Sequence, residues 1–155
     1  MRGQRAKRKP QQRDPKYGNP VLARLINKVM QDGKKSTAES LVYDALEKAS
    51  KKYKIDADKF LEEVVNKLRP SLEIRTRRVG GANYSVPTPV SPARQEALAI
   101  RWLVDYTRSK SGDSFSNLLQ KELESAFNGE GDAIKKKIDV ERMAEANKAF
   151  AHFRW

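Results

Sequence analysis

The chain has 155 residues, 38% of them hydrophobic and 34% charged, which is enough for one buried core and leaves little for a second. Its 32 lysines and arginines outnumber its 20 acidic residues, giving a formal charge of +12, so we expect an anionic partner, with nucleic acid as the first candidate. Cysteine is absent, which excludes disulfides and thiolate chemistry, and without an apolar run of membrane-spanning length or a signal peptide we expect a cytoplasmic protein with no membrane partner.

Residues 1–16 are expected to form a basic N-terminal extension. Asp14 is the only acid among them. The basic residues of this segment are Arg2, Arg5, Lys7, Arg8, Lys9, Arg13 and Lys16. Because so polar a stretch cannot fold by burial, we expect it to serve as an arm that binds phosphate.

Two amphipathic helices follow the extension. Asn19 and Pro20 supply a cap and a first-turn proline for the first helix, whose apolar residues recur at helical spacing until Gly33. Ser36 and Glu39 have the spacing of a capping box in front of the second. Both apolar stripes indicate packing into a core.

A third helix and then a hairpin are predicted next. Asp56 or Asp58 can cap the helix and Pro70 ends it. Over residues 71–90 the apolar period changes to two, with Gly80 and Gly81 at the turn. Its outgoing limb carries Arg75, Arg77 and Arg78. Since the return limb contains two prolines, we expect a ribbon that projects, stands alone and is stabilised by an anionic partner.

Three further helices complete the expected fold. Ser91 and Pro92 begin the fourth, and the fifth ends before Gly129. Asp139 can cap the sixth. Its expected inward residues are Val140, Met143, Ala144 and Asn147. The aromatic residues 150–155 can pack on the body or on a neighbouring protein. The fold class is therefore mainly α: one domain of about six helices, residues 17–155, with a protruding hairpin between helices three and four.

The positive charge is localised. Residues 1–16 carry a net +6 and residues 69–94 a net +4, so these two segments hold +10 of the total +12, and the remaining residues are nearly balanced. A near-neutral body with basic appendages is typical of a protein that grips a polyanion, although solubility alone is the simpler alternative.

The sequence offers little for catalysis. Gly33 lacks the upstream glycine of a phosphate-binding loop, because Lys28 stands there. The only histidine, His152, lies close to the C-terminus, which excludes a two-histidine metal site and disfavours a catalytic triad. We therefore expect no enzyme, no catalytic residues, no metal and no cofactor.

Several features favour RNA. The hairpin arginines can fork onto phosphates, and Tyr84 can either stack on an unpaired base or pack internally. Lys34 and Lys35 lie in the turn between the first two helices, and residues 135–137 are expected just before the last helix, where its dipole adds to their field. Basic groups on several sides suit a folded RNA.

Four stretches carry a family resemblance: residues 32–35 (DGKK), 77–84 (RRVGGANY), 98–103 (LAIRWL) and 139–155. From about residue 13 to residue 155 the chain resembles the bacterial small-subunit ribosomal protein seven family. It differs from the family at residues 1–4, which lack the usual dense arginines, and at residues 109–117, which are polar rather than basic.

The resemblance implies six helices with a ribbon between the third and fourth, in a structural constituent of the small ribosomal subunit. Such proteins bind the 3′ major domain of 16S rRNA early and nucleate assembly of the 30S head. They lie at the subunit interface near the decoding centre, with the ribbon toward exit-site tRNA and the C-terminal region near the path of the mRNA. Small-subunit ribosomal proteins nine and eleven are the implied protein neighbours.

These considerations give a set of candidate residues. The expected rRNA contacts are Arg2, Arg5, Lys7, Arg8, Lys9, Arg13, Lys28, Lys34, Lys35, Arg75, Arg77, Arg78, Arg94, Arg101, Lys135, Lys136, Lys137 and Arg142. The expected tRNA- and mRNA-proximal residues are Arg77, Arg78, Gly80, Gly81, Asn83, Tyr84, Arg154 and Trp155. The alternative is a non-ribosomal basic RNA- or DNA-binding regulatory protein, for which no outward recognition helix is evident.

Overall fold

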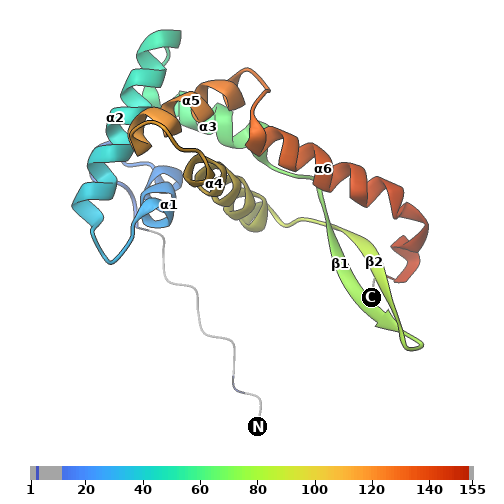
Figure 1. The fold of residues 1–155 in the computed structure, drawn as a ribbon. Coiled ribbons are helices and arrows are strands. Elements are labelled where there is room, and N and C mark those ends of the chain that lie inside the picture. Colours follow the sequence, from blue (N-terminus) through green and yellow to red (C-terminus); the bar gives the residue numbers. More distant parts are fainter. Residues whose placement is uncertain (1–2, 4–11, 154–155) are drawn as a thin grey trace.

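The computed structural model describes residue 3 and residues 12–153. It is mainly helical with one β-hairpin between the third and fourth helices, as predicted (Figure 1). The elements in chain order are α1 (Pro20–Val29), α2 (Lys35–Tyr53), α3 (Ala57–Leu68), β1 (Leu72–Val79), β2 (Ala82–Pro89), α4 (Pro92–Ser109), α5 (Phe115–Phe127), α6 (Asp132–Ala146) and the short 3-10 helix η1 (Lys148–Phe153).

The core lies among α1 to α5, with the first turn of α6 closing one side. Leu22, Leu46 and Leu103, from α1, α2 and α4, are fully buried in it. Each such side chain contributes roughly 1.5–3 kcal/mol through the hydrophobic effect. At the far end of the helices Phe60 stacks on Phe127, with ring centroids 4.9 Å apart. The predicted apolar stripes therefore do pack together, as expected.

The starts of the first two helices differ in how well they were predicted. Asn19 caps α1, its Oδ1 accepting from the N–H of Val21 at 2.7 Å, which confirms the predicted cap. The predicted capping box of α2 is wrong. The helix begins one residue before Ser36, and its N-cap residue Lys34 makes no side-chain capping bond. The chain makes a tight turn at Gly33, where φ is +73° and the carbonyl accepts from the N–H of residue 35. The helix therefore begins directly after this turn, before the residue that was predicted to cap it.

The last α-helix starts eight residues earlier than predicted: its N-cap is Gly131 and not Asp139, which lies inside the helix. Gly131 precedes it at φ +92°, and the buried Glu122 carboxylate of α5 accepts from the N–H of Ala133 at 3.0 Å. A side chain from another helix thus satisfies the free N–H group that a local cap would satisfy.

The earlier start changes what surrounds the helix. Residues 135–137 lie within its first two turns and not before it, which corrects the predicted arrangement. Ala144 is buried as predicted, but Met143 is 44% exposed and points outward. Asn147 is the C-cap residue and its side chain donates to the Met143 carbonyl. The position of residues 135–137 follows directly from the missed helix start.

The hairpin has a two-residue turn. Gly80 and Gly81 have φ values of +58° and +90°, and only glycine adopts two successive positive values readily, as this hairpin turn requires. The strands pair antiparallel, with Arg75 opposite Val86 and Arg77 opposite Tyr84. Both prolines of β2 are tolerated because the sheet in the described part of the chain has only these two strands, each with a free edge.

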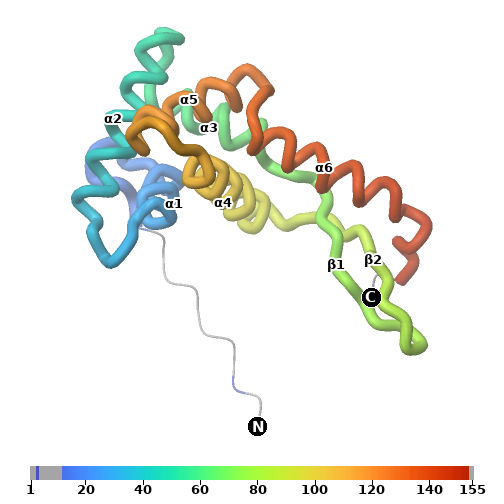
Figure 2. The backbone as a smooth tube through the Cα atoms, in the orientation of Figure 1, coloured from blue at the N-terminus to red at the C-terminus, as the bar shows by residue number. Residues whose placement is uncertain are grey.

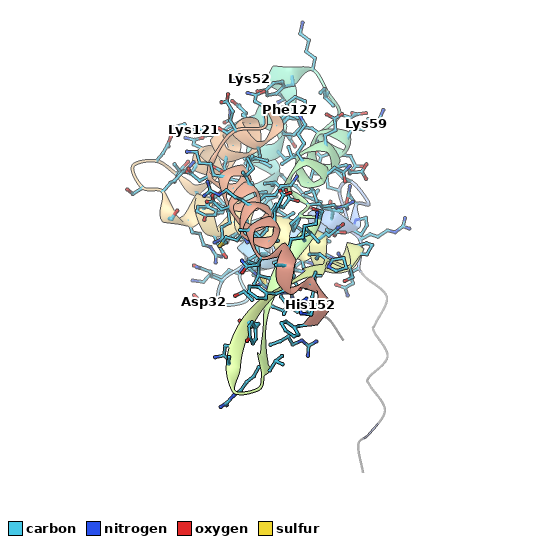
Figure 3. The ribbon with its side chains drawn as sticks, turned by 90° about the vertical axis from the view of Figure 1, so that its right-hand side faces the viewer. Asp32, Lys52, Lys59, Lys121, Phe127 and His152 are labelled. Carbon is cyan, nitrogen blue, oxygen red and sulfur yellow. The ribbon has the colours of Figure 1, made fainter. Side chains whose placement is uncertain are left out.

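The hairpin projects from the helical body, as predicted, but it does not stand alone (Figures 1 and 2). The C-terminal chain runs back along it, so α6 packs against β1 and η1 packs against β2. Tyr84 meets Phe150 and Phe153 with ring centroids 5.4 and 5.0 Å apart. Figure 3 shows His152 at this junction, at the end of the molecule away from Lys52. Of the two alternatives for the C-terminal aromatics, packing on the body is the one observed for residues 150 and 153.

The chain before α1 is fastened to α2. Asp14 is buried; its carboxylate accepts from the Tyr43 hydroxyl at 2.5 Å and from the N–H of Tyr17 at 2.9 Å. Burial, followed by this hydrogen bond to Asp14, raises the pKa of the Tyr43 hydroxyl above its usual range. Lys16 forms an ion pair with Glu47 beside the same site. These contacts therefore fasten residues 14–17 to α2.

Candidate nucleic-acid interface

The hairpin presents its three predicted arginines to solvent. Arg75, Arg77 and Arg78 are all exposed on β1. Side chains alternate along a strand, so the first two lie on one face and Arg78 on the other. Arg78 is next to the turn and has no carboxylate within ion-pair distance in the described part of the chain. The projecting ribbon can therefore offer guanidinium groups on both of its faces.

One acid lies at the base of these arginines. Glu73 on β1 is only 7% exposed. Its Oε1 accepts from Arg75 Nε at 2.8 Å, and its Oε2 accepts from Arg94 Nε, in the first turn of α4, at 2.6 Å. Burial raises the pKa of the Glu73 carboxyl, but hydrogen bonds from Arg94 and Arg75 outweigh it and leave that pKa below its usual value. The carboxylate is therefore ionised at neutral pH and joins the hairpin to α4.

A second acid on α4 has a similar arrangement. Glu96 pairs with Arg24 of α1 at 2.5 Å and with Arg69, after α3, at 3.7 Å. Neither arginine was among the predicted contacts, and both are partly exposed. No local pattern marks them, because only the packing of three helices brings them to one carboxylate. They extend the basic surface from the hairpin base along the first turns of α4.

Most of the remaining predicted cations have an acidic neighbour. These pairs are Lys28 with Asp105, Lys34 with Asp32, Lys35 with Glu39, Lys135 with Asp132, and Arg142 with Asp139. All are at the surface, where an ion pair contributes only about 0–1 kcal/mol. Such cations can exchange their partner for a phosphate at little cost.

The other predicted contacts lie at separate places. Arg13, Arg101 and Lys136 have no ion pair to any acid in residues 12–153. Lys137 instead donates to the carbonyl of Lys67, at the end of α3, at 2.9 Å. The remaining predicted residues, Arg2, Arg5, Lys7, Arg8, Lys9, Arg154 and Trp155, lie outside the described residues.

The structure does not gather the predicted cations into one patch. The turn between α1 and α2 lies at one end of the molecule and the hairpin at the other, with α4 between them, and α6 runs beside the hairpin (Figure 1). Gly80, Gly81 and Asn83 are exposed at the hairpin tip, where the exit-site tRNA contacts were predicted. Tyr84 is half-buried against the two C-terminal phenylalanines, so internal packing is its observed role.

The described residues hold little that could support a reaction. A groove of about 450 Å³ between the hairpin base and α6 is lined by leucine, proline and alanine with Ser71, Glu141, Glu145 and Lys148. Glu141 is occupied there, accepting from the N–H and the hydroxyl of Ser71. Residues 12–153 contain no cluster of His, Asp and Glu suited to a metal ion. None of the helices described has the length and apolar content needed to cross a bilayer.

Comparison with known proteins gives the family. Residues 1–148 match the model of ribosomal protein S7p/S5e. The chain belongs to this ribosomal protein family. It is 48% identical over 155 residues, all of both chains, to a protein of Corynebacterium diphtheriae named small ribosomal subunit protein uS7. A protein of that name from Thermosipho africanus is 50% identical over 155 residues, all of both chains. One from Dichelobacter nodosus is 51% identical over 142 residues, which is 92% of this chain and 91% of the relative.

The resemblance found in the sequence is thereby confirmed. The protein is a structural constituent of the small ribosomal subunit, located with the ribosome in the cytoplasm, and its family is not one of enzymes. The alternative of a non-ribosomal regulatory protein is set aside. The fold of the protein suits a ribosomal role, because a near-neutral helical body carries basic groups outward on a ribbon.

Proposed function

We propose that this protein binds the 3′ major domain of 16S rRNA directly and nucleates folding of the 30S head. The observation that carries the proposal is the hairpin itself. It projects from the body with Arg75, Arg77 and Arg78 exposed, and its one acid, Glu73, is buried. Exposed guanidinium groups on a projecting ribbon can lie against a phosphate backbone and release the counterions condensed there.

The spread of the other cations supports RNA rather than duplex DNA. Basic groups are exposed at the hairpin base, at Lys34 and Lys35 where α2 begins, and on α6 at Lys135. A rod-like duplex meets only one side of so small a body, whereas a folded RNA junction surrounds it. The protein would therefore neutralise phosphates on several RNA helices at once and favour their compact arrangement.

The finer placement on the ribosome follows the family resemblance. We place the hairpin tip, with its exposed Gly80, Gly81 and Asn83, near exit-site tRNA. The C-terminal residues that follow η1 would then lie near the mRNA. We assign the contacts with ribosomal proteins nine and eleven to the C-terminal region and its surroundings. Ile138 and Met143, exposed on α6 at 54% and 44%, supply apolar area for one such contact.

A binding assay with the purified full chain tests the rRNA proposal. Filter binding would compare a 3′ major domain RNA fragment with a duplex DNA of equal charge and with an rRNA fragment from another domain. We expect the first RNA to bind far more tightly, with the logarithm of its affinity falling linearly with the logarithm of salt concentration at a slope of several units. Equal affinity for all three probes at physiological salt would overturn the proposal.

Variants of the hairpin locate the binding surface. Replacing Arg75, Arg77 and Arg78 with alanine should weaken RNA binding and reduce the salt slope by about one unit for each phosphate that is no longer neutralised. Helical circular dichroism should remain nearly unchanged, since these side chains are exposed. A matched control replaces Lys48, Lys51 and Lys52, which are exposed on α2 at the opposite end of the molecule, as the position of Lys52 in Figure 3 shows. If both triple variants bind equally well, the hairpin does not touch the RNA.

A further inference from the structure

We infer that Glu73, although acidic, is a positioning residue for RNA binding: it holds Arg75 and Arg94 in the orientation in which their remaining N–H groups meet phosphate. This inference rests on the proposed function. It gives a role to a buried carboxylate that lies between the hairpin and the first turn of α4.

The geometry shows how one carboxylate can orient two arginines. Arg75 directs Nε and Nη2 at Oε1, at 2.8 and 2.7 Å, while Arg94 directs Nε at Oε2, at 2.6 Å. Each guanidinium thereby uses only part of its donor set, and both side chains remain about half exposed, at 54% and 47%. The unused N–H groups keep a fixed direction outward, in the planar fork that suits a phosphate.

The carboxylate is itself held in place. Glu73 lies within the ladder of the hairpin, opposite Thr88, whose hydroxyl donates to the Glu73 carbonyl at 3.3 Å. Its side chain is buried, while the guanidinium groups that it binds are not. A rigid acceptor below two exposed donors is the arrangement expected of a support, since the RNA would meet the arginines and not the acid.

The acid acts against RNA binding in one respect and for it in another. Its negative charge lowers the local positive potential, so simple electrostatics predicts that removing it strengthens binding to a polyanion. Its hydrogen bonds fix two long side chains before the RNA arrives, which removes an ordering cost of about 0.5–1.5 kcal/mol per side chain on binding. The two effects predict opposite results for the same substitution, and this makes the inference testable.

The decisive variant is Glu73→Gln. Its amide keeps one oxygen acceptor but turns an NH2 group toward the second guanidinium, so one arginine loses its partner while net charge increases by one. We expect its affinity for the 3′ major domain fragment to fall on the order of tenfold at physiological salt, as the arginine that faces the NH2 group loses its fixed orientation. Glu145→Gln is the charge-matched control, because Glu145 is exposed on α6 beside the hairpin and has no ion pair within residues 12–153. That variant should bind as wild type or slightly tighter.

Two further measurements distinguish the positioning role of Glu73 from a purely structural one. In a background of Arg75→Ala and Arg94→Ala, Glu73→Gln should no longer weaken binding, because it acts only through those arginines. Arg94→Lys keeps the charge but loses the fork, so we expect it to lower affinity several-fold even in a protein whose melting curve is unchanged. This variant also decides the question if Glu73→Gln does not fold.

The inference fails if folded Glu73→Gln binds the RNA as tightly as wild type or more tightly, or if its loss persists in the double-alanine background. Should Glu73→Gln not fold, wild-type affinity of Arg94→Lys would overturn it. Failure of the proposed function looks different, because the wild-type protein would then not prefer the rRNA fragment over duplex DNA in the first place.

Discussion

The C-terminal aromatic residues should control how firmly the hairpin is held, and this can be tested by replacing Phe150 and Phe153 together with alanine. Their rings meet Tyr84 of β2 at centroid distances of 5.4 and 5.0 Å. These distances are within the range of favourable aromatic pairs, each of which contributes about 0.5–1.5 kcal/mol beyond simple burial. Losing both pairs should therefore cost the closed hairpin roughly 1–3 kcal/mol.

The expected effect is local. Because 1.4 kcal/mol corresponds to a factor of ten, opening of the hairpin should become roughly 5- to 150-fold more frequent. The core formed by α1 to α5 contains neither phenylalanine, so the melting temperature of the helical body should change little. Amide hydrogen exchange measured by mass spectrometry checks this. Peptides spanning residues 72–89 report the opening of the hairpin, and peptides from α2 and α5 report the protection of the helical body.

A control separates this effect from a general loss of apolar surface. Ile138→Ala removes an aliphatic side chain from the exposed face of α6 and should leave exchange in the hairpin unchanged. If the double alanine variant also left hairpin exchange at the wild-type rate, the aromatic pairs would carry no stabilising free energy. If instead α2 and α5 lost protection to the same degree, the hairpin and body would unfold as one unit.

Three further changes should alter stability in defined ways. Asn19→Ala should lower the free energy of unfolding by about 1–2 kcal/mol in urea denaturation through loss of the α1 cap. Asn19→Ser should retain most of the wild-type stability, because serine can also cap the helix. Gly131→Ala should cost more than about 1 kcal/mol in the same assay, because a Cβ would meet Ser125 Cβ at 3.0 Å and Glu122 Oε1 at 3.1 Å, and φ is +92°; wild-type stability would refute this. Acid should destabilise the fold, because hydrogen bonds from Lys121 and Asn117 lower the pKa of Asp113 to about 2. The contribution of Asp113 to the free energy of unfolding is complete above its unfolded pKa near 4 and is lost as pH falls toward 2. Thermal melts from pH 6 to 2 check this, and Asp113→Asn should flatten the dependence.

The sequence was informative wherever the determining interactions are local. The cap at Asn19, the glycine turn at Gly80 and Gly81, and the apolar stripes of five helices could all be predicted, because each depends on residues within a few positions of one another. The hairpin arginines were also predictable as exposed groups, since a short ribbon with a basic outgoing strand has no core in which to bury them.

The errors arose where a distant residue decides the local structure. The start of α6 was missed because its N-terminal N–H is satisfied by Glu122, from the preceding helix. The burial of Glu73 in β1 was not predicted, because it depends on two arginines from different elements. Arg24 was missed for the same reason, since it meets Glu96 only once α1 and α4 have packed.

The fastening of Asp14 to α2 has a consequence for the kinetics of assembly. Once the folded body has docked on RNA, Arg13, the residue next to this anchor, is held at a fixed point on the body. Its encounter with a nearby phosphate is then intramolecular, with an effective concentration that can reach millimolar values. Removing the Tyr43 hydrogen bond to Asp14 would loosen this anchor and slow the capture of phosphate by Arg13, without removing a single charge.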